Sequence, residues 1–283
     1  MKIAVVTDSN SGIFEKQAKQ LGVYTLPLPF CIDGAWLYEG VDLSAADFYE
    51  KQAAGAEITT SQPSPADVTG LWEELLKTHD QIVHIPMTSA LSSGCATAQS
   101  LAQEYGGRVQ VADNRRISLT QQQAVKDAAL LARRGHTAAE IRRRLEEHAL
   151  DASIYVTADT LKYLKKGGRV TPGAAAIGTV LNIKPVLQIQ GGPVDACAKV
   201  RGMRQATEKM LDALCADLTG RFEGMPMHLG VAWSGNEELG RKWHRYVQAR
   251  FPKCRVQAAP LALSIACHTG PGALGVGCFY YEE

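Results

Sequence analysis

The sequence QIVHIPMTSALSSGCATAQS, residues 81–100, shows the pattern on which the first half of the chain is built. It begins with apolar and β-branched residues, which are typical of a buried strand. A loop rich in serine and threonine follows, and then small residues with helical spacing. Parallel strands need a crossover connection, which is usually a helix, so this order predicts one unit of a parallel sheet.

The same alternation extends on both sides of this stretch. Strand-like runs occur at residues 2–8, 108–114 and 152–159, with helical patterns at 65–77, 90–103, 120–134 and 138–148. They predict an α/β domain in which a parallel sheet carries helices on both faces. Ligands of such sheets bind at the carboxyl ends of the strands. Hydroxyl residues follow several predicted strands at that edge: Thr7, Ser9, Thr88, Ser89 and Thr157.

The pattern changes near residue 159. Residues 160–170 predict a helix closed by glycines, and residues 172–181 a helix of small residues. Residues 183–200 predict a hairpin that turns at Gly191 and Gly192. Hairpins mixed with helices indicate an α+β second domain, so we expect domains at 1–158 and 159–283.

The bulk composition excludes several classes of protein. The 283 residues include 30 basic and 29 acidic side chains, which provide no overall field for nucleic acid or anionic membranes. Seven cysteines are scattered without a C-x-x-C pair, so no metal site is expected. The first residues do not resemble a signal peptide, and no apolar run approaches ~20 residues, so a cytoplasmic protein without a membrane span is expected.

Local enzyme signatures are also missing from the sequence. The G-x-G-x-x-G at Gly270, Gly272 and Gly275 lies too close to the end of the chain for a dinucleotide-binding unit, and a glycine-rich bend is the simpler interpretation. There is no Gly-Lys dipeptide for a phosphate-binding loop, and no G-x-S-x-G or H-E-x-x-H. A serine and a histidine from distant positions still leave a hydrolase open.

Two polar stretches have more than one possible role. EITTSQPSPADV, residues 57–68, gathers Thr59, Thr60, Ser61 and Ser64 without an adjacent histidine, which suits a helix cap, a nucleophile or an anion cradle. LKKGGRV, residues 164–170, suits either a helix C-cap with cations at the negative dipole end or a basic rim for an anionic ligand or partner.

Taken together, these stretches resemble the DegV family, the fatty-acid-binding proteins of bacteria. The resemblance rests on seven motifs whose order spans nearly the whole chain. They are VTDS (6–9), TSQPSP (60–65), LSSGCATA (91–98), LKKGGRV (164–170), LNIKPVL (181–187), KVR (199–201) and HTGPGALG (268–275).

The resemblance implies a two-domain protein that holds one long-chain fatty acid in a buried tunnel, which the second domain closes. It implies a non-catalytic component of a fatty acid kinase system, without a cofactor of its own. The partner kinase would supply ATP and Mg²⁺ and convert the carboxylate into an acyl phosphate for phospholipid synthesis. Two alternatives remain open: an acyl hydrolase using a serine with His268, and a lipid reservoir or sensor without a kinase.

The resemblance also implies roles for individual residues. Thr60, Ser61, Ser92, Ser93 and His268 would surround the carboxylate, and Arg169 and Arg201 would face the kinase and its phosphates. The family's serine loop commonly reads L-S-G-T-Y-Q-S-A, whereas Ser93, Gly94 and Cys95 stand here in place of Gly-Thr-Tyr. The motif therefore leaves open which serine contacts the head group. The alternative roles are a helix cap for Ser61, a helix start for Ser92 and Ser93, a domain seam for His268 and a surface charge for Arg201.

Overall fold

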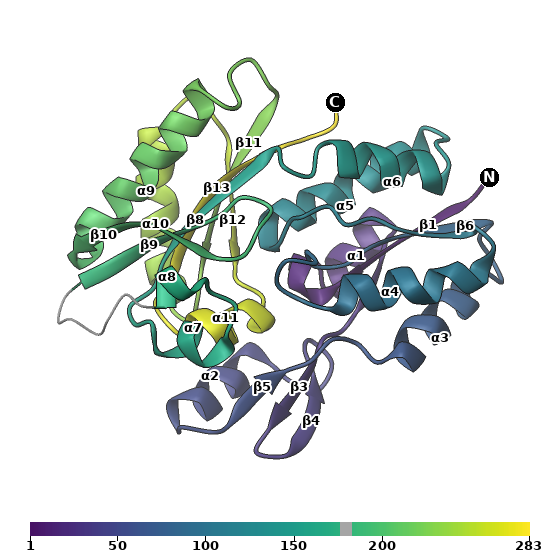
Figure 1. The fold of residues 1–283 in the computed structure, drawn as a ribbon, viewed down its shortest axis with the longest axis horizontal. Coiled ribbons are helices and arrows are strands. Elements are labelled where there is room, and N and C mark those ends of the chain that lie inside the picture. The colour runs from purple at the N-terminus through teal and green to yellow at the C-terminus, as the bar shows by residue number, and fades with distance from the viewer. Residues whose placement is uncertain (176–182) are drawn as a thin grey trace. The chain divides into compact units, whose positions relative to one another are not determined.

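The computed structural model describes residues 1–175 and 183–283, which form two compact units (Figure 1). Unit 1 comprises Met1–Leu150 with Glu282, and unit 2 comprises Asp151–Tyr281 with Glu283. Part of the predicted helix at 172–181 and the first two residues of the motif at 181–187 lie outside the described residues.

Unit 1 is built on a parallel sheet, as the sequence predicts. Its strands are β1 (Ile3–Asp8), β2 (Tyr24–Leu26), β6 (Gln81–Ile85) and β7 (Val109–Val111). They lie in the order β2-β1-β6-β7, and every pair is parallel. Val5 pairs with Val83 in the two central strands. The loops that follow β1 and β6 therefore leave the sheet at the same edge.

Helices cover both faces of this sheet. On one face lie α1 (Glu15–Leu21), α5 (Ser118–Arg133) and α6 (Ala138–Glu147), and on the other α3 (Pro65–Leu75) and α4 (Gly94–Ala102). Successive side chains of a strand point to opposite faces. Accordingly, Val5 joins the first cluster, and Ala4 and Val6 join the second. Because helices bury both faces of the sheet, its strands are apolar along nearly their whole length instead of alternating between apolar and polar residues.

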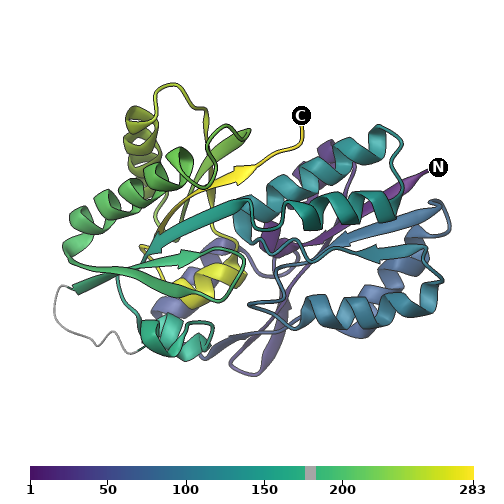
Figure 2. The ribbon, with the colours of Figure 1, turned by 45° about the horizontal axis from the view of Figure 1, so that its top comes forward.

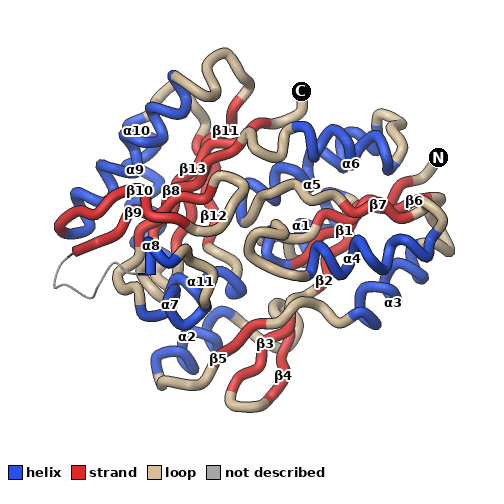
Figure 3. The backbone as a smooth tube through the Cα atoms, viewed as in Figure 1, coloured by secondary structure: helices blue, strands red, loops and turns tan. Residues whose placement is uncertain are grey.

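A second, antiparallel sheet in unit 1 is missing from the sequence-based description. Its strands are β3 (Pro29–Ile32), β4 (Ala35–Tyr38) and β5 (Ile58–Thr60), in the order β4-β3-β5, and α2 (Ala45–Ala53) lies between β4 and β5 in the chain (Figure 3). Asp33 and Gly34 form its turn with φ values of 49° and 85°. An Asp-Gly pair between apolar runs is a strong hairpin signal, so the sequence contained the clue.

Unit 2 contains a mixed six-stranded sheet. Its strands are β8 (Ala152–Thr157), β9 (Ile183–Ile189), β10 (Asp195–Arg201), β11 (Met227–Trp233), β12 (Val256–Pro260) and β13 (Leu274–Tyr280). The order is β10-β9-β8-β13-β11-β12, and only β11 and β12 pair in parallel among these strands. The predicted hairpin of β9 and β10 is confirmed.

The strand at 152–159, which the sequence pattern assigns to the first domain, belongs instead to the sheet of unit 2. As β8, it pairs antiparallel with β13 and β9. Its apolar, β-branched residues suit a central strand of either sheet, because a buried strand has the same composition whichever neighbours it pairs with. The division between the units lies at Leu150 and Asp151.

Two long helices, α9 (Gly202–Thr219) and α10 (Glu237–Arg250), share one core with the sheet of unit 2 (Figure 2). Met210 and Trp243 pack there with Val231 and Val276. The shorter helices are α7 (Lys162–Gly167), α8 (Pro172–Ala175) and α11 (Leu263–Thr269). The short 3-10 helices of unit 1 are η1 (Ser9–Ser11) and η2 (Gln103–Tyr105).

The described residues also bear on membranes and metals. No helix in residues 1–175 and 183–283 is long and apolar enough to cross a bilayer. Within the same ranges, no cluster of histidine, cysteine, aspartate and glutamate could hold a metal ion.

Candidate functional site

The hydroxyl cluster of residues 59–64 divides between capping and other roles. Ser64, not Ser61, is the N-cap of α3: its Oγ accepts from the N–H of Asp67 at 3.1 Å, and the Asp67 carboxylate bonds back to Ser64 in a capping box. Ser61 is exposed and anchored by its backbone N–H, which donates to the carbonyl of Pro29 at 3.0 Å. Its hydroxyl is therefore not needed to start the helix.

Gln62 connects the two predicted serine loops. Its Oε1 accepts hydrogen bonds from Ser93 Oγ at 2.8 Å and from Thr97 Oγ1 at 3.2 Å. The structure therefore brings Thr60 and Ser61 close in space to the loop after β6. Sequence reasoning missed Gln62, because a glutamine in a polar loop carries no signal of what it bonds.

The structure distinguishes the two adjacent serines. Ser93 occupies the N-cap position of α4, but its hydroxyl makes no capping bond there and donates to Gln62. Ser92 Oγ accepts from the N–H of Gly94 at 3.1 Å, and this leaves its own hydrogen available for another acceptor. Ser92 is half-buried and lines a small pocket, whereas Ser93 is exposed.

This pocket lies at the carboxyl ends of β1 and β6. It is mostly enclosed, lies within unit 1 and has room for about one water molecule. Its wall includes Asp8, His84, Met87, Ser92, Thr97 and Pro63. Sequence reasoning treats Asp8 only as a strand end, and His84 lies inside a strand pattern without any signal of function.

Asp8 is a buried carboxylate with three hydrogen-bond donors. Its Oδ2 accepts from the N–H of Met87 at 2.7 Å, and its Oδ1 accepts from Gln121 Nε2 at 3.0 Å and from the N–H of Asn10 at 3.2 Å. Burial raises the pKa of Asp8 from 3.8 to about 6, against the opposing effect of these donors. Asp8 therefore titrates close to neutral pH.

His84 is the opposite case, a buried ring without polar partners. It is 2% exposed, and neither ring nitrogen has a hydrogen-bonding partner among the described residues. Trp72 stacks edge-on against it, with 5.6 Å between ring centroids. Burial lowers the pKa of His84 to about 3, so the ring is neutral at pH 7 and offers one donor and one acceptor.

The pocket thus combines the residue types of a hydrolase triad without triad geometry. Asp8, His84 and Ser92 share its wall, but His84 forms no hydrogen bond with either of the others in the described part of the chain. A nucleophilic serine needs a base within hydrogen-bond reach, which a third group orients. This geometry lends no support to a hydrolase centred on Ser92.

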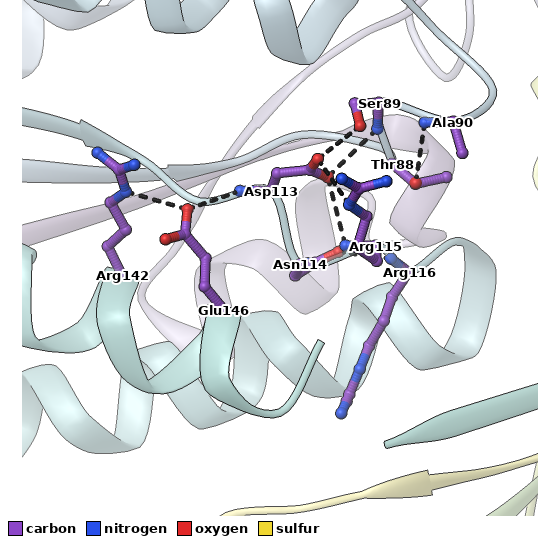
Figure 4. A network of polar contacts seen from close by, with 9 residues as sticks. All are labelled: Thr88, Ser89, Ala90, Asp113, Asn114, Arg115, Arg116, Arg142 and Glu146. Atoms are coloured by element: carbon purple, nitrogen blue, oxygen red, sulfur yellow. Dashed lines mark hydrogen bonds and ion pairs between the residues drawn. The ribbon is translucent and has the colours of Figure 1, made fainter. Parts of the chain in front are cut away.

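The loop that carries Ser92 is braced by the loop after β7 (Figure 4). The carboxylate of Asp113 accepts from the N–H of Ser89 at 3.3 Å and from its Oγ at 2.5 Å, and it pairs with Arg115 Nε at 3.1 Å. The N–H of Thr88 donates to the carbonyl of Arg116 at 3.1 Å. These bonds fix residues 88 and 89, so the following serines start from a defined position.

In unit 2, His268 lies near the end of α11 and against α7. A β-carbon built at Gly167 would lie 2.3 Å from its Nδ1, so the ring occupies the space that only glycine leaves there. Gly270, which follows α11 with a φ of 75°, makes the same close approach to Tyr163 of α7. The glycine-rich run after His268 is a bend between α11 and β13, as the sequence predicts.

The His268 ring is mostly buried and neutral at pH 7. Burial, and to a lesser extent the positive charge of Arg169, lowers its pKa to about 4. A neutral imidazole still provides one N–H donor, which suits a carboxylate ligand.

Arg169 and Arg201 are both exposed, but Arg169 lies beside the residue that precedes β10 and Arg201 lies at the other end of that strand. The carbonyl of Arg169 accepts from the N–H of Val194, just before β10, whereas Arg201 is its last residue. The intervening strand spans roughly 20 Å at about 3.3 Å per residue. The Arg169 side chain donates to the carbonyl of Gly167, so it also helps to close α7.

The total charge is nearly neutral, but the charged residues are divided unequally between the two units. Unit 1 carries 14 basic and 19 acidic residues, and unit 2 carries 16 basic and 10 acidic residues. Their formal charges are therefore −5 and +6. Arg169 and Arg201 both belong to the basic unit, whose field favours an anionic ligand or partner.

Fold and site together define a two-unit α/β protein with a small pocket at the carboxyl edge of a parallel sheet, whose wall includes Asp8, His84, Ser92 and Thr97. A family model for DegV, described as an uncharacterised protein of the DegV family, matches residues 2–281. A DegV domain-containing protein of Deinococcus radiodurans is 34% identical over 281 residues, which cover 98% of each chain. The chain belongs to the DegV family.

Solved structures extend the similarity. One, described as fatty acid binding of a DegV family protein from Thermus thermophilus, matches with a TM-score of 0.88 and 32% identity, covering 99% of this chain and 100% of that one. Another, DegV of Bacillus subtilis, described as a fatty acid binding protein, matches with a TM-score of 0.87 and 28% identity over 99% of both chains.

Proposed function

We propose that this protein binds one long-chain fatty acid and presents its carboxylate to a partner kinase for phosphorylation to an acyl phosphate. The observation that carries the proposal is the pairing of the two serine loops through Gln62, beside a pocket at the carboxyl edge of the sheet. Fatty acid binding is supported by what is described for the similar Thermus thermophilus and Bacillus subtilis proteins. The kinase step rests on the family resemblance of the sequence motifs.

The proposed head-group site uses neutral donors. The proposed donors are the hydroxyls of Thr60, Ser61 and the serine loop, and the imidazole N–H of His268. A carboxylate offers about four acceptor sites, which these donors can fill. They neutralise the anion less than a bidentate arginine would, so the carboxylate keeps the nucleophilicity that phosphorylation needs.

Within the serine loop, we assign the head-group contact to Ser92. Its hydrogen is free of any acceptor in the described residues, whereas Ser93 donates to Gln62. Ser93 would then connect the serine loop to the loop of Gln62 through its hydrogen bond, and its exposed hydroxyl would not contact the lipid.

The tail and the head group would have different roles in binding. Burial of about fourteen methylenes contributes roughly 11 kcal/mol before costs, at about 0.8 kcal/mol per CH₂. A few hydrogen bonds add only about 1 kcal/mol each. The tail would supply the affinity, and the hydroxyls would set the position of the carboxylate.

The basic unit would serve the kinase interaction, in the cytoplasm where ATP is available. Arg169 and Arg201 are exposed on a unit with a formal charge of +6. Because Arg169 lies beside the residue that precedes β10 and Arg201 lies at the other end of that strand, we expect them to contact different parts of the kinase and its nucleotide. ATP and Mg²⁺ would belong to the kinase, and this chain would contribute no cofactor.

The experiment that tests lipid binding is extraction of the purified protein under denaturing conditions, followed by mass spectrometry. The proposal expects one fatty acid per chain after expression in lipid-replete cells. An extract without fatty acid, together with failure to bind added oleate, would refute it. Adding a fatty acid kinase and ATP to the loaded protein tests the second step. Loaded protein from which no kinase forms acyl phosphate would instead indicate a reservoir or sensor.

A further inference from the structure

His84 poses a problem that the fold alone does not solve. Burying a polar group without a hydrogen bond is destabilising, so nearly all such groups have partners. His84 is 2% exposed, and both ring nitrogens are without a partner among the described residues. A leucine or phenylalanine in the same strand would avoid that cost.

The enclosed pocket beside the ring suggests what the partner is. It has room for about one water molecule, and a buried water typically needs two to four polar contacts. Asp8, His84, Ser92 and Thr97 offer polar atoms on its wall, and Leu28, Pro63 and Val68 contribute apolar surface.

The other polar atoms of the pocket wall already form hydrogen bonds within the protein. A water molecule can therefore bond only to their remaining donor and acceptor sites. Oδ1 of Asp8 already accepts from Gln121 and from the N–H of Asn10, but Oδ2 accepts only from the N–H of Met87 and has a second acceptor site. Thr97 Oγ1 donates to Gln62, and Ser92 Oγ accepts from the N–H of Gly94. Ser92 can accept a second bond and still donate its own hydrogen outward.

We propose that this pocket binds a single water molecule that links His84 and Asp8 to the hydroxyl of Ser92. The water accepts from the His84 N–H, donates one hydrogen to Asp8 and donates the other to Ser92 Oγ. A hydroxyl that accepts such bonds becomes a better donor, because hydrogen bonds in a chain polarise one another. His84 is then a positioning residue for Ser92, and this role rests on the proposed binding of a carboxylate.

The first test is a crystal structure of the full-length protein at about 1.2 Å resolution. A solvent peak within hydrogen-bonding distance of a His84 nitrogen and of Ser92 Oγ is expected, and a pocket without density would overturn the proposal. The ¹⁵N chemical shifts of the His84 ring give a second measurement on the unmodified protein. Shifts of a ring without hydrogen bonds would likewise overturn it.

The second test measures oleate binding by His84→Phe, which keeps an aromatic ring against Trp72. A loss of about tenfold in affinity is expected, on the scale of one hydrogen bond, with partial recovery in His84→Gln. His79→Phe is the matched control, because His79 packs edge-on against Tyr24 in the same unit and does not line the pocket. Unchanged affinity in His84→Phe would overturn the positioning role. If the wild-type protein binds no oleate, the proposed function fails, but the solvent peak still decides the water site.

Discussion

The imidazole of His268 lies in the space beside Gly167, where a β-carbon would come within 2.3 Å of Nδ1. This contact joins two motifs, LKKGGRV and HTGPGALG, that are about a hundred residues apart in the sequence. It explains why the first of the two glycines is needed, since Gly168 with its φ of 65° already provides the left-handed cap of α7. The pair of glycines therefore has two separate tasks.

Gly167→Ala should displace the His268 ring and weaken fatty acid binding by about tenfold, the effect of losing one hydrogen bond to a charged group. Gly192→Ala is the matched control, because a β-carbon there meets no atom within 4 Å. Oleate titration with fluorescence detection measures both. Equal affinities in the two variants would show that the position of His268 is irrelevant to the ligand.

Ser92→Ala and Ser93→Ala should separate ligand contact from loop stability. We expect Ser92→Ala to weaken oleate binding by about fivefold to tenfold, because it removes the donor to the carboxylate. Ser93→Ala should reduce binding less, but it should lower the free energy of unfolding by about 1 kcal/mol through the lost bond to Gln62. A larger binding loss in Ser93→Ala would reverse our assignment of the two serines.

Arg169→Ala and Arg201→Ala should each retain the bound lipid but reduce acyl phosphate formation by the kinase. Both side chains are exposed, and removing them leaves the apolar core intact. Lys209→Ala, which changes another exposed cation of unit 2, serves as the control. Extracted lipid and acyl phosphate are measured on the same samples. Loss of lipid from the arginine variants would mean that they belong to the head-group site.

Asp8 makes stability depend on pH. Its pKa is raised from 3.8 to about 6, so its contribution to stability is complete below about pH 4 and is lost as the pH rises through 6. From pH 7 to pH 5, wild-type protein should therefore gain about 1 kcal/mol in unfolding free energy relative to Asp8→Asn. Urea unfolding at both pH values measures the difference. Parallel pH profiles would contradict the raised pKa.

The sequence predicted the parallel sheet of unit 1 because buried β-branched runs and helical spacing are local properties. The sheet that receives β8 could not be read in this way, since its pairing with β13 joins segments more than a hundred residues apart. The hairpin at Asp33 and Gly34, by contrast, has a local signal in the sequence, because an Asp-Gly pair favours a tight turn.

The candidate site likewise contains residues that the sequence motifs indicate and residues that only the structure reveals. The motifs drew attention to the serine loops and to His268, but not to the partners that arrange them. Gln62, Asp8 and His84 gain their significance from hydrogen bonds and burial across the fold. The assignment of the helix cap to Ser64 rather than Ser61 likewise needed the position of the backbone.

The most direct test of the central claim is a crystal structure of the protein with its fatty acid bound. Our account predicts a carboxylate oxygen within about 3 Å of Ser92 Oγ, surrounded by hydroxyl and imidazole donors. A carboxylate held instead by a lysine or arginine, or one that leaves Ser92 without contact, would contradict it.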